Sequence, residues 1–326
     1  MESRKILIIQ TAFLGDVILA TPLVENLSRQ FPHATIDFLL KKGNESLLSG
    51  HPKINQLLIF DKSNKRRSFI ALLKLIRKEK YDLVVNLHRF ASSGLLTVTS
   101  GAKETRGFKK NPFSFLYSKR FDHDIMSGTH EVDRNLSTIE DLLEIVERRP
   151  CLYPNSADFS AVAHWKKDQY YCLAPASIWF TKQAPPALWQ YLIEKFDDEG
   201  IQFYLLGGPS DSELCEAIKE LSQRKNVHNL AGKLSIMQSA ALMKDATRNF
   251  VNDSGPLHIA SSGNAPVTAF FCSTDPSFGF GPLSDHAEII EVKNLDCRPC
   301  GLHGHRACPK GHFACGNGLI QALNQS

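Results

Sequence analysis

The sequence lacks the features that mark several common protein classes. It contains no run of about 18 apolar residues, which excludes an ordinary transmembrane helix. It has neither a G-x-G-x-x-G fingerprint nor a Walker lysine, which argues against a dinucleotide oxidoreductase and a standard phosphate-binding loop. The apolar run Ile6–Ile9 is too short for a signal peptide and no small-residue cleavage site follows it, so we expect a cytoplasmic protein.

The length of the chain and its pattern of apolar segments predict two domains. At 326 residues it exceeds the size at which one core usually keeps growing. Apolar segments alternate with amphipathic helical segments, as in parallel sheets with crossover helices. We therefore expect an α/β protein with two Rossmann-like domains facing a cleft. The Pro150–Pro154 region is the expected linker, which gives domains at residues 1–155 and 156–326.

The periodicity of apolar residues predicts individual elements in both halves. In the first half we expect strands at Lys5–Ile9, Thr35–Leu40, Gln56–Phe60 and Leu83–Asn86, and helices at about Asp16–Gln30, Ser68–Glu79 and Val132–Val146. In the second half we expect strands at Tyr170–Ala174, Ile201–Leu206, Asn226–Asn229, Asn249–Val251 and Pro266–Phe271. Helices are expected there at about Pro185–Glu199, from Asp211 to Arg224, and at Ser235–Asp245. The stretch from Arg89 to His130 is less regular.

The net charge of +4 is unevenly distributed. Residues 1–160 carry 24 Lys and Arg against 18 Asp and Glu, whereas the remainder carries 14 against 16. The excess is concentrated at Lys62–Lys80 and at Lys103–Arg120, and aromatic residues are interleaved with the second cluster. Such clusters suit an anionic partner such as a phosphorylated lipid, a membrane surface or a nucleic acid. A solvated helix face explains the first cluster equally well, and a loop packed on its own domain explains the second equally well.

The first candidate site, Gly15-Asp16, follows the first strand. Open α/β sheets bind ligands at the carboxyl ends of their strands. Gly15 permits a tight turn, and Asp16 lies where a helix begins. Asp16 is therefore either a helix cap, which its position favours, or a general base for an acceptor hydroxyl. One carboxylate can also serve both purposes.

The second candidate site is the loop Asn252-Asp253-Ser254-Gly255, where a strand ends and a helix with His258 begins. The N–H groups and the positive dipole end at a helix start bind phosphate well. Ser254 can donate a hydrogen bond from its hydroxyl. Because Asp253 is negative and repels phosphate, we expect it to orient the amides or to bind a sugar hydroxyl. Helix capping alone explains the loop but not the histidine.

Two further loops follow strands of the second half. The segment Ser177–Lys182 carries a lysine suited to clamp a departing diphosphate, with Ser177 and Thr181 near it, although a loop lysine is usually only solvated. The segment Gly207–Glu213 is a weak phosphate loop, but its position after a strand places Glu213 near the same site.

Together these segments resemble the ADP-heptose:lipopolysaccharide heptosyltransferases of glycosyltransferase family nine. Lys182 falls where the family keeps a lysine. Ser254 replaces the usual Thr and keeps its hydroxyl. The region from Arg89 to His130 departs from the family pattern, so the acceptor stays open. The other similar segments are Gly15-Asp16, Ala20-Thr21-Pro22-Leu23, Asn252–Ala260, Ala265-Pro266-Val267 and Ser273-Thr274-Asp275-Pro276.

The resemblance implies a GT-B fold that binds the acceptor in the N-terminal domain and an ADP-sugar in the C-terminal domain. It implies one inverting displacement without an obligatory metal, in which Asp16 takes the acceptor proton and Lys182 stabilises the leaving diphosphate. The implied acceptor is an anionic lipid-linked saccharide at the inner face of the cytoplasmic membrane. The implied donor contacts are Ser177, Thr181, Lys182, Glu213, Asp253, Ser254, Gly255 and His258. The expected acceptor contacts are Gly15 and, from the second basic cluster, Lys109 and Lys110.

Four of the eight cysteines lie in the C-terminal tail, as Cys297-x2-Cys300-x7-Cys308-x6-Cys315 with histidines among them. These residue types and spacings predict a structural zinc site, and the alternative is a set of buried thiols that tie the tail to its domain. Disulfides are not expected in a reducing cytoplasm.

Other functions are compatible with these residues. A transferase that uses another nucleotide sugar, a sugar-nucleotide epimerase, or a non-catalytic nucleotide-sugar-binding protein would keep the same donor loop. A nucleic-acid-binding function rests on the basic clusters alone, and we expect no nucleic-acid partner.

Overall fold

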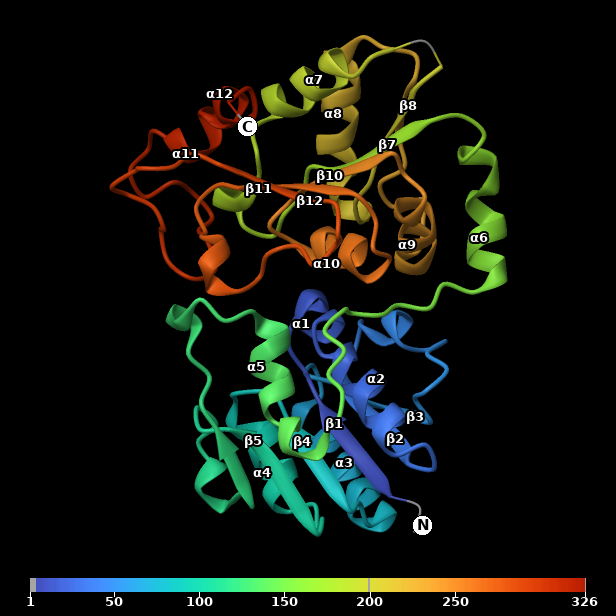
Figure 1. The fold of residues 1–326 in the computed structure, drawn as a ribbon, viewed down its shortest axis with the longest axis vertical. Coiled ribbons are helices and arrows are strands. Elements are labelled where there is room, and N and C mark those ends of the chain that lie inside the picture. The colour runs from blue at the N-terminus through green and yellow to red at the C-terminus, as the bar shows by residue number, and fades with distance from the viewer. Residues whose placement is uncertain (1–3, 199, 326) are drawn as a thin grey trace. The chain divides into compact units, whose positions relative to one another are not determined.

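The computed structural model describes residues 4–198 and 200–325. The chain divides into two compact units, Met1–Tyr153 and Pro154–Ser326, close to the expected boundary after residue 155. Each unit contains one six-stranded parallel sheet with helices packed on it (Figure 1). The predicted α/β class is therefore confirmed. Within the described residues, no helix has both the length and the apolar character needed to cross a membrane.

The sheet of the first unit has the strand order β3-β2-β1-β4-β5-β6. The order reverses between β1 and β4, because β2 and β3 extend the sheet on one side and β5 and β6 on the other. Such a switch point is where open α/β sheets bind ligands. The strands are β1 (Lys5–Ile9), β2 (Thr35–Lys41), β3 (Gln56–Phe60), β4 (Leu83–Asn86), β5 (Glu104–Phe108) and β6 (Lys119–Phe121).

The helices of the first unit are α1 (Leu14–Ile18), α2 (Thr21–Gln30), α3 (Lys65–Glu79), α4 (Ala91–Val98) and α5 (Glu131–Ser137). The prediction of one helix over Asp16–Gln30 is wrong, because the chain starts a new helix at Thr21. Pro22 lacks an N–H group for a continuous helix, and Thr21 Oγ1 donates to the Ile18 carbonyl at 2.7 Å. As a result, Asp16 lies on a short helix of its own directly after β1.

The second unit has the strand order β12-β11-β10-β7-β8-β9, with its switch point between β7 and β10. Its strands are β7 (Tyr170–Ala174), β8 (Gln202–Leu205), β9 (Val227–Asn229), β10 (Arg248–Asn252), β11 (Val267–Phe271) and β12 (Ala287–Glu291). Its helices are α6 (Ser156–Val162), α7 (Pro186–Lys195), α8 (Ser212–Ser222), α9 (Ile236–Lys244), α10 (Gly255–Ser262), α11 (Ala314–Asn317) and α12 (Leu319–Leu323). The helix predicted to reach Glu199 ends at Lys195, and Glu199 lies outside the described residues.

Apolar side chains fix the helices on the sheets. In the first unit, Leu72 and Ile76 of α3 belong to the same buried cluster as Leu7 of β1. In the second unit, the fully buried Trp189 of α7 packs edge-on against Phe270 of β11. These cores hold the carboxyl ends of the central strands in place, and the loops that follow them carry the candidate site residues.

Several elements, including β5, β6, β12, α4 and α6, were not predicted from the pattern. The central residue of β5, Arg106, is 1% exposed because its guanidinium is paired with Glu104 and Asp141. A buried arginine interrupts the apolar run by which strands are recognised. The helix predicted over Val132–Val146 is also too long, because α5 ends at Ser137 and the chain turns so that Asp141 reaches Arg106.

Candidate active site

At the switch point of the first sheet, a buried hydrogen bond joins the loops after β1 and β4. Thr11 Oγ1 lies 3.0 Å from Nδ1 of His88, and Nζ of Lys62 donates to the Thr11 carbonyl at 2.8 Å. Burial and the charges of Lys62 and Arg89 lower the pKa of His88 to about 4, so its ring is neutral at pH 7. His88 was not predicted as a site residue, because one histidine after a strand carries no local motif.

Asp16 is the third residue of α1, not the expected N-cap residue, which is Phe13. Its carboxylate accepts the N–H of Phe13 at 3.0 Å. Burial and the nearby Glu131 carboxylate raise the pKa of Asp16 to about 6. A carboxylate has about four lone-pair sites, so the cap leaves capacity to accept a hydrogen bond from a substrate hydroxyl. Gly15 precedes Asp16 in the first turn of the same helix.

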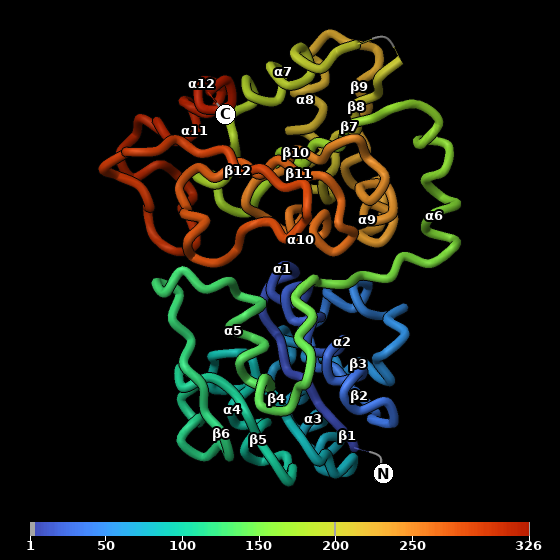
Figure 2. The backbone as a smooth tube through the Cα atoms, in the orientation of Figure 1, coloured from blue at the N-terminus to red at the C-terminus, as the bar shows by residue number. Residues whose placement is uncertain are grey.

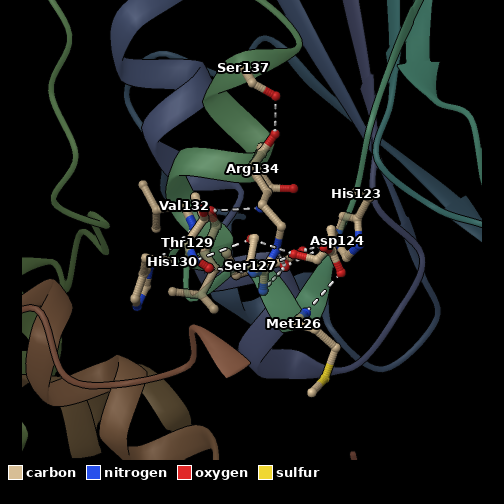
Figure 3. A network of polar contacts seen from close by, with 12 residues as sticks. His123, Asp124, Met126, Ser127, Thr129, His130, Val132, Arg134 and Ser137 are labelled. Atoms are coloured by element: carbon tan, nitrogen blue, oxygen red, sulfur yellow. Dashed lines mark hydrogen bonds and ion pairs between the residues drawn. The ribbon is translucent and has the colours of Figure 1, made fainter. Parts of the chain in front are cut away.

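Glu131, the first residue of α5, interacts with His123 and Arg134, which are labelled in Figure 3. Its carboxylate lies 3.1 Å from Nε2 of His123 and accepts from Nε of Arg134 at 2.8 Å. Arg134 extends from α5 and also donates to the carbonyls of Asp124 and Thr129 (Figure 3). Although burial opposes it, the bonds from His123 and Arg134 lower the pKa of Glu131. Glu131 therefore remains charged and contributes to the raised pKa of Asp16.

The loops after β4, β5 and β6 combine cations with exposed apolar side chains. Lys109 and Lys110 directly follow β5 and are both exposed, and Nζ of Lys109 lies 2.7 Å from Oδ2 of Asp122. The large apolar side chains in this region that are more than half exposed are Phe90, Phe115, Leu116 and Met126. The structure thus places the predicted acceptor lysines directly after β5, at the carboxyl edge of the first sheet.

In the second unit, the loops after β7, β10 and β11 meet at one ion pair. Nζ of Lys182 lies 2.7 Å from Oδ2 of Asp253, and Thr274 Oγ1 donates to the same oxygen at 2.6 Å. The side chains of Lys182 and Asp253 are 16% and 7% exposed. Asp253 therefore orients the lysine, a contact that the order of residues in the sequence did not reveal.

Asn252, the last residue of β10, connects these loops. Its Nδ2 donates to the Pro175 carbonyl at 2.7 Å, and its Oδ1 accepts the N–H of Ala184 at 3.0 Å. Pro175 and Ala184 lie on either side of Lys182 in the chain. The fully buried Asn252 thus holds the loop of Lys182 against the strand that presents Asp253.

Helix α10 starts at Gly255, with Ser254 as its N-cap residue. The Ser254 hydroxyl lies 3.4 Å from the Asn252 carbonyl and does not cap the helix. The first N–H groups of the helix are therefore not bonded by the Ser254 side chain and are available to bind an anion. His258 is buried one turn into the helix.

The remaining predicted donor contacts occupy different environments. Ser177 Oγ accepts the N–H of Trp179 at 3.4 Å, and Glu213 is exposed on α8 after β8. Thr181 is 1% exposed and its hydroxyl is bonded to His305 and Ser273. Its hydroxyl is thus engaged inside the unit, and we assign Thr181 a supporting position instead of a direct donor contact.

The tail cysteines lie near one another but are not arranged as metal ligands. Sγ of Cys297 lies 4.0 Å from Nε2 of His312, and the Cys300 thiol donates to the Cys297 carbonyl at 2.8 Å. Among the described residues, no three His, Cys, Asp or Glu side chains are placed to hold one ion. All eight cysteines are free thiols. The zinc site of Cys297, Cys300, Cys308 and Cys315 therefore stays a prediction, and no chemistry is assigned to it.

Comparison with known proteins identifies the family. Residues 69–309, well over half of the chain, match glycosyltransferase family 9 (heptosyltransferase). The chain belongs to glycosyltransferase family 9. The resemblance inferred from the motifs is thereby confirmed, and this family 9 protein is a glycosyltransferase enzyme.

Two curated relatives of this family 9 enzyme are similar over most of its length. The lipopolysaccharide heptosyltransferase 3 of Escherichia coli K12 is 30% identical over 287 residues, which are 81% of each chain. The lipooligosaccharide heptosyltransferase 2 of Haemophilus influenzae is 24% identical and is matched over 88% of each chain.

Solved structures of other glycosyltransferases share the fold. A family 9 glycosyltransferase of Veillonella parvula has a TM-score of 0.81 at 23% identity, covering 99% of this chain and 96% of that one. E. coli ADP-heptose lipopolysaccharide heptosyltransferase II has a TM-score of 0.77 at 22% identity, covering 98% of each chain. The E. coli heptosyltransferase WaaC with ADP has a TM-score of 0.71 at 18% identity, covering 98% of this chain and 97% of that one. The family 9 enzyme therefore has the predicted GT-B fold.

Proposed function

We propose that this enzyme transfers a heptose, or a related sugar, from an ADP-sugar to an anionic lipopolysaccharide-core saccharide. The observation that carries the proposal is the Lys182–Asp253 ion pair in the loops after β7 and β10, where α10 begins without a side-chain cap. The family membership supports the reaction class, and relatives named as lipopolysaccharide heptosyltransferases support the substrates.

The second unit supplies the donor half of the reaction. The positive end of α10 at Ser254 and Gly255 binds the diphosphate, and Lys182 neutralises the charge that develops when ADP leaves. Asp253 sets the position of the lysine before the donor arrives, so no reorganisation is needed during the reaction. Ser177 and His258 complete the phosphate contacts. The exposed Glu213 carboxylate accepts hydrogen bonds from donor hydroxyls.

The first unit supplies the base. Asp16 accepts the proton of the acceptor hydroxyl while that oxygen attacks the anomeric carbon. The bond from the anomeric carbon to the diphosphate oxygen breaks, and ADP departs with the electron pair. The configuration at the anomeric carbon is inverted, because attack and departure take place on opposite faces. The raised pKa of Asp16 suits this role, since a carboxylate with a pKa of about 6 is a better proton acceptor than an ordinary one.

The charges of the first unit support an anionic acceptor. Lys62, at the start of the loop before α3, and Lys109 and Lys110, after β5, lie at the carboxyl edge of the sheet. The exposed apolar side chains of the same region, such as Phe115 and Leu116, suit the lipid part of the acceptor at the inner face of the membrane. Phosphate groups on the acceptor would be bound through these lysines.

A donor screen tests the proposal. Calorimetry of the full chain should show tighter binding of ADP-heptose than of UDP- or GDP-sugars, and incubation with a core saccharide should release ADP and give a product of inverted anomeric configuration. Tighter binding of UDP- or GDP-sugars would indicate that the protein is another transferase or a sugar-nucleotide epimerase. Binding of ADP-heptose without ADP release in the presence of acceptors would indicate a sugar-nucleotide sensor.

A further inference from the structure

The cysteine-rich tail contacts the loop of Lys182 directly. Between β12 and α11 the backbone follows an irregular path without helix or strand (Figure 2). Despite this, the tail is fixed to the second unit, since Phe313 is buried and its ring centroid lies 5.1 Å from that of Phe180. The residues 298–305 of the tail, which we call the clasp, make the contacts described below.

The clasp holds Thr181 by two hydrogen bonds in opposite directions. The N–H of His305 donates to Thr181 Oγ1 at 2.7 Å, and the N–H of Thr181 donates to the His305 carbonyl at 3.1 Å. The Ser273 hydroxyl also donates to Thr181 Oγ1, at 2.9 Å. Both acceptor positions of the Thr181 hydroxyl are therefore used. Because Lys182 is the next residue, its backbone position follows that of Thr181.

Gly304 allows the clasp to approach Lys182 closely. A Cβ atom at this position would lie 2.9 Å from Cγ of Lys182, 3.1 Å from Oγ1 of Thr181 and 3.2 Å from Cβ of Trp179. The φ angle of Gly304 is +78°, a conformation that other residues rarely adopt. Cγ of Lys182 is near the backbone, so the lysine cannot yield to such an atom without moving its whole side chain.

The clasp also holds the loop that positions Asp253. The N–H of Cys300 donates to the Ser273 carbonyl at 2.8 Å, and Nη2 of Arg298 donates to the Thr274 carbonyl at 2.7 Å. Thr274 in turn donates to Asp253. The same short segment therefore restrains both partners of the Lys182–Asp253 pair, Lys182 through Thr181 and Asp253 through Thr274.

We infer that the clasp positions Lys182 for the donor diphosphate, with Thr181, Gly304 and His305 as positioning residues that act through the lysine. This inference rests on the proposed role of Lys182 in binding the diphosphate. The tail is then a part of the donor site that acts through the position of Lys182.

A pair of glycine substitutions tests the inference. Gly311 lies in the same tail with a φ angle of +75°, and a Cβ atom there would have no neighbour within 4 Å. Gly304→Ala and Gly311→Ala therefore carry a similar backbone strain, but only Gly304→Ala displaces Lys182. Calorimetry with ADP should show affinity weakened about tenfold in Gly304→Ala, a size typical of residues in contact, and less than about twofold in Gly311→Ala. Equal effects of the two substitutions would overturn the inference.

A second set of variants separates the clasp from the proposed function. Thr181→Val removes the acceptor of the His305 bond and should weaken ADP binding, whereas Thr181→Ser should preserve it. In a Lys182→Ala background, Thr181→Val and Gly304→Ala should cause no further loss. Additive losses would refute the clasp and leave the role of Lys182 intact. Unchanged ADP affinity in the Lys182→Ala variant would refute both the role of Lys182 in diphosphate binding and the inference that the clasp positions it.

Discussion

Nζ of Lys182 lies 2.7 Å from Oδ2 of Asp253, although the two residues follow different strands, β7 and β10. These strands are neighbours at the switch point of the second sheet, so their carboxyl ends bring the two loops together. The Asp253 carboxylate neutralises the positive charge of Lys182 and fixes the direction of its ammonium group. The proposed binding of the leaving diphosphate would use a lysine that is already held in this direction.

Lys182→Ala should lower kcat/KM about 100-fold, as is usual when one electrostatic stabiliser of a transition state is removed. Steady-state release of ADP from ADP-heptose in the presence of acceptor measures this. The matched control is Lys166→Ala, which removes another lysine of the second unit that is paired with an aspartate, Asp245, before β7 begins. This control should keep full activity. Equal rates of both variants would contradict the role of Lys182.

Asp16→Asn should reduce transfer by about 10²- to 10⁴-fold, the usual contribution of a general base. The amide oxygen of Asn can still accept the Phe13 N–H, so α1 keeps its cap and the protein should melt at an unchanged temperature. ADP affinity, measured by calorimetry, should also be unchanged, because Asp16 belongs to the first unit. Transfer at the wild-type rate in this variant would exclude Asp16 as the base.

The pH profile should reveal the raised pKa of Asp16. A base must be deprotonated to act, so kcat/KM should fall as the pH decreases through about 6, where Asp16 becomes protonated. Glu131→Gln removes the neighbouring negative charge and should move this limb to lower pH. Glu140→Gln, an exposed carboxylate of the same unit, should leave it in place. A limb near pH 4 in the wild type would contradict the assignment.

Lys109→Ala combined with Lys110→Ala should raise the KM for a phosphorylated acceptor several-fold, with an effect that salt diminishes. ADP affinity should not change. The control is Arg77→Ala with Lys78→Ala, two exposed cations near the end of α3. A 15-residue helix spans about 22 Å, so these residues lie far from the carboxyl edge where α3 begins. A similar rise in KM for both double variants would indicate diffuse attraction instead of a defined acceptor site.

Elemental analysis of the purified protein tests the predicted zinc site. One zinc per chain, lost on replacement of Cys297 and Cys300 by Ser, would establish it. Metal-free protein that retains its activity would leave the alternative, in which buried thiols such as Cys315 tie the tail to the core of the second unit.

The sequence by itself determined the fold class and most of the central strands. β1, β4 and β7 have the predicted bounds, because strands covered on both faces form continuous apolar runs. The bounds of the edge strand β3 were also predicted. It also indicated the family, since Asp16 and the loop at Asp253 lie at fixed positions after such strands.

Tertiary structure alone decided what these residues contact. The pairing of Lys182 with Asp253, the burial of Thr181 beneath the tail and the proximity of Glu131 to Asp16 all join segments far apart in the chain. The local periodicity of apolar residues cannot predict such contacts, because it reflects only which face of a helix or strand is buried.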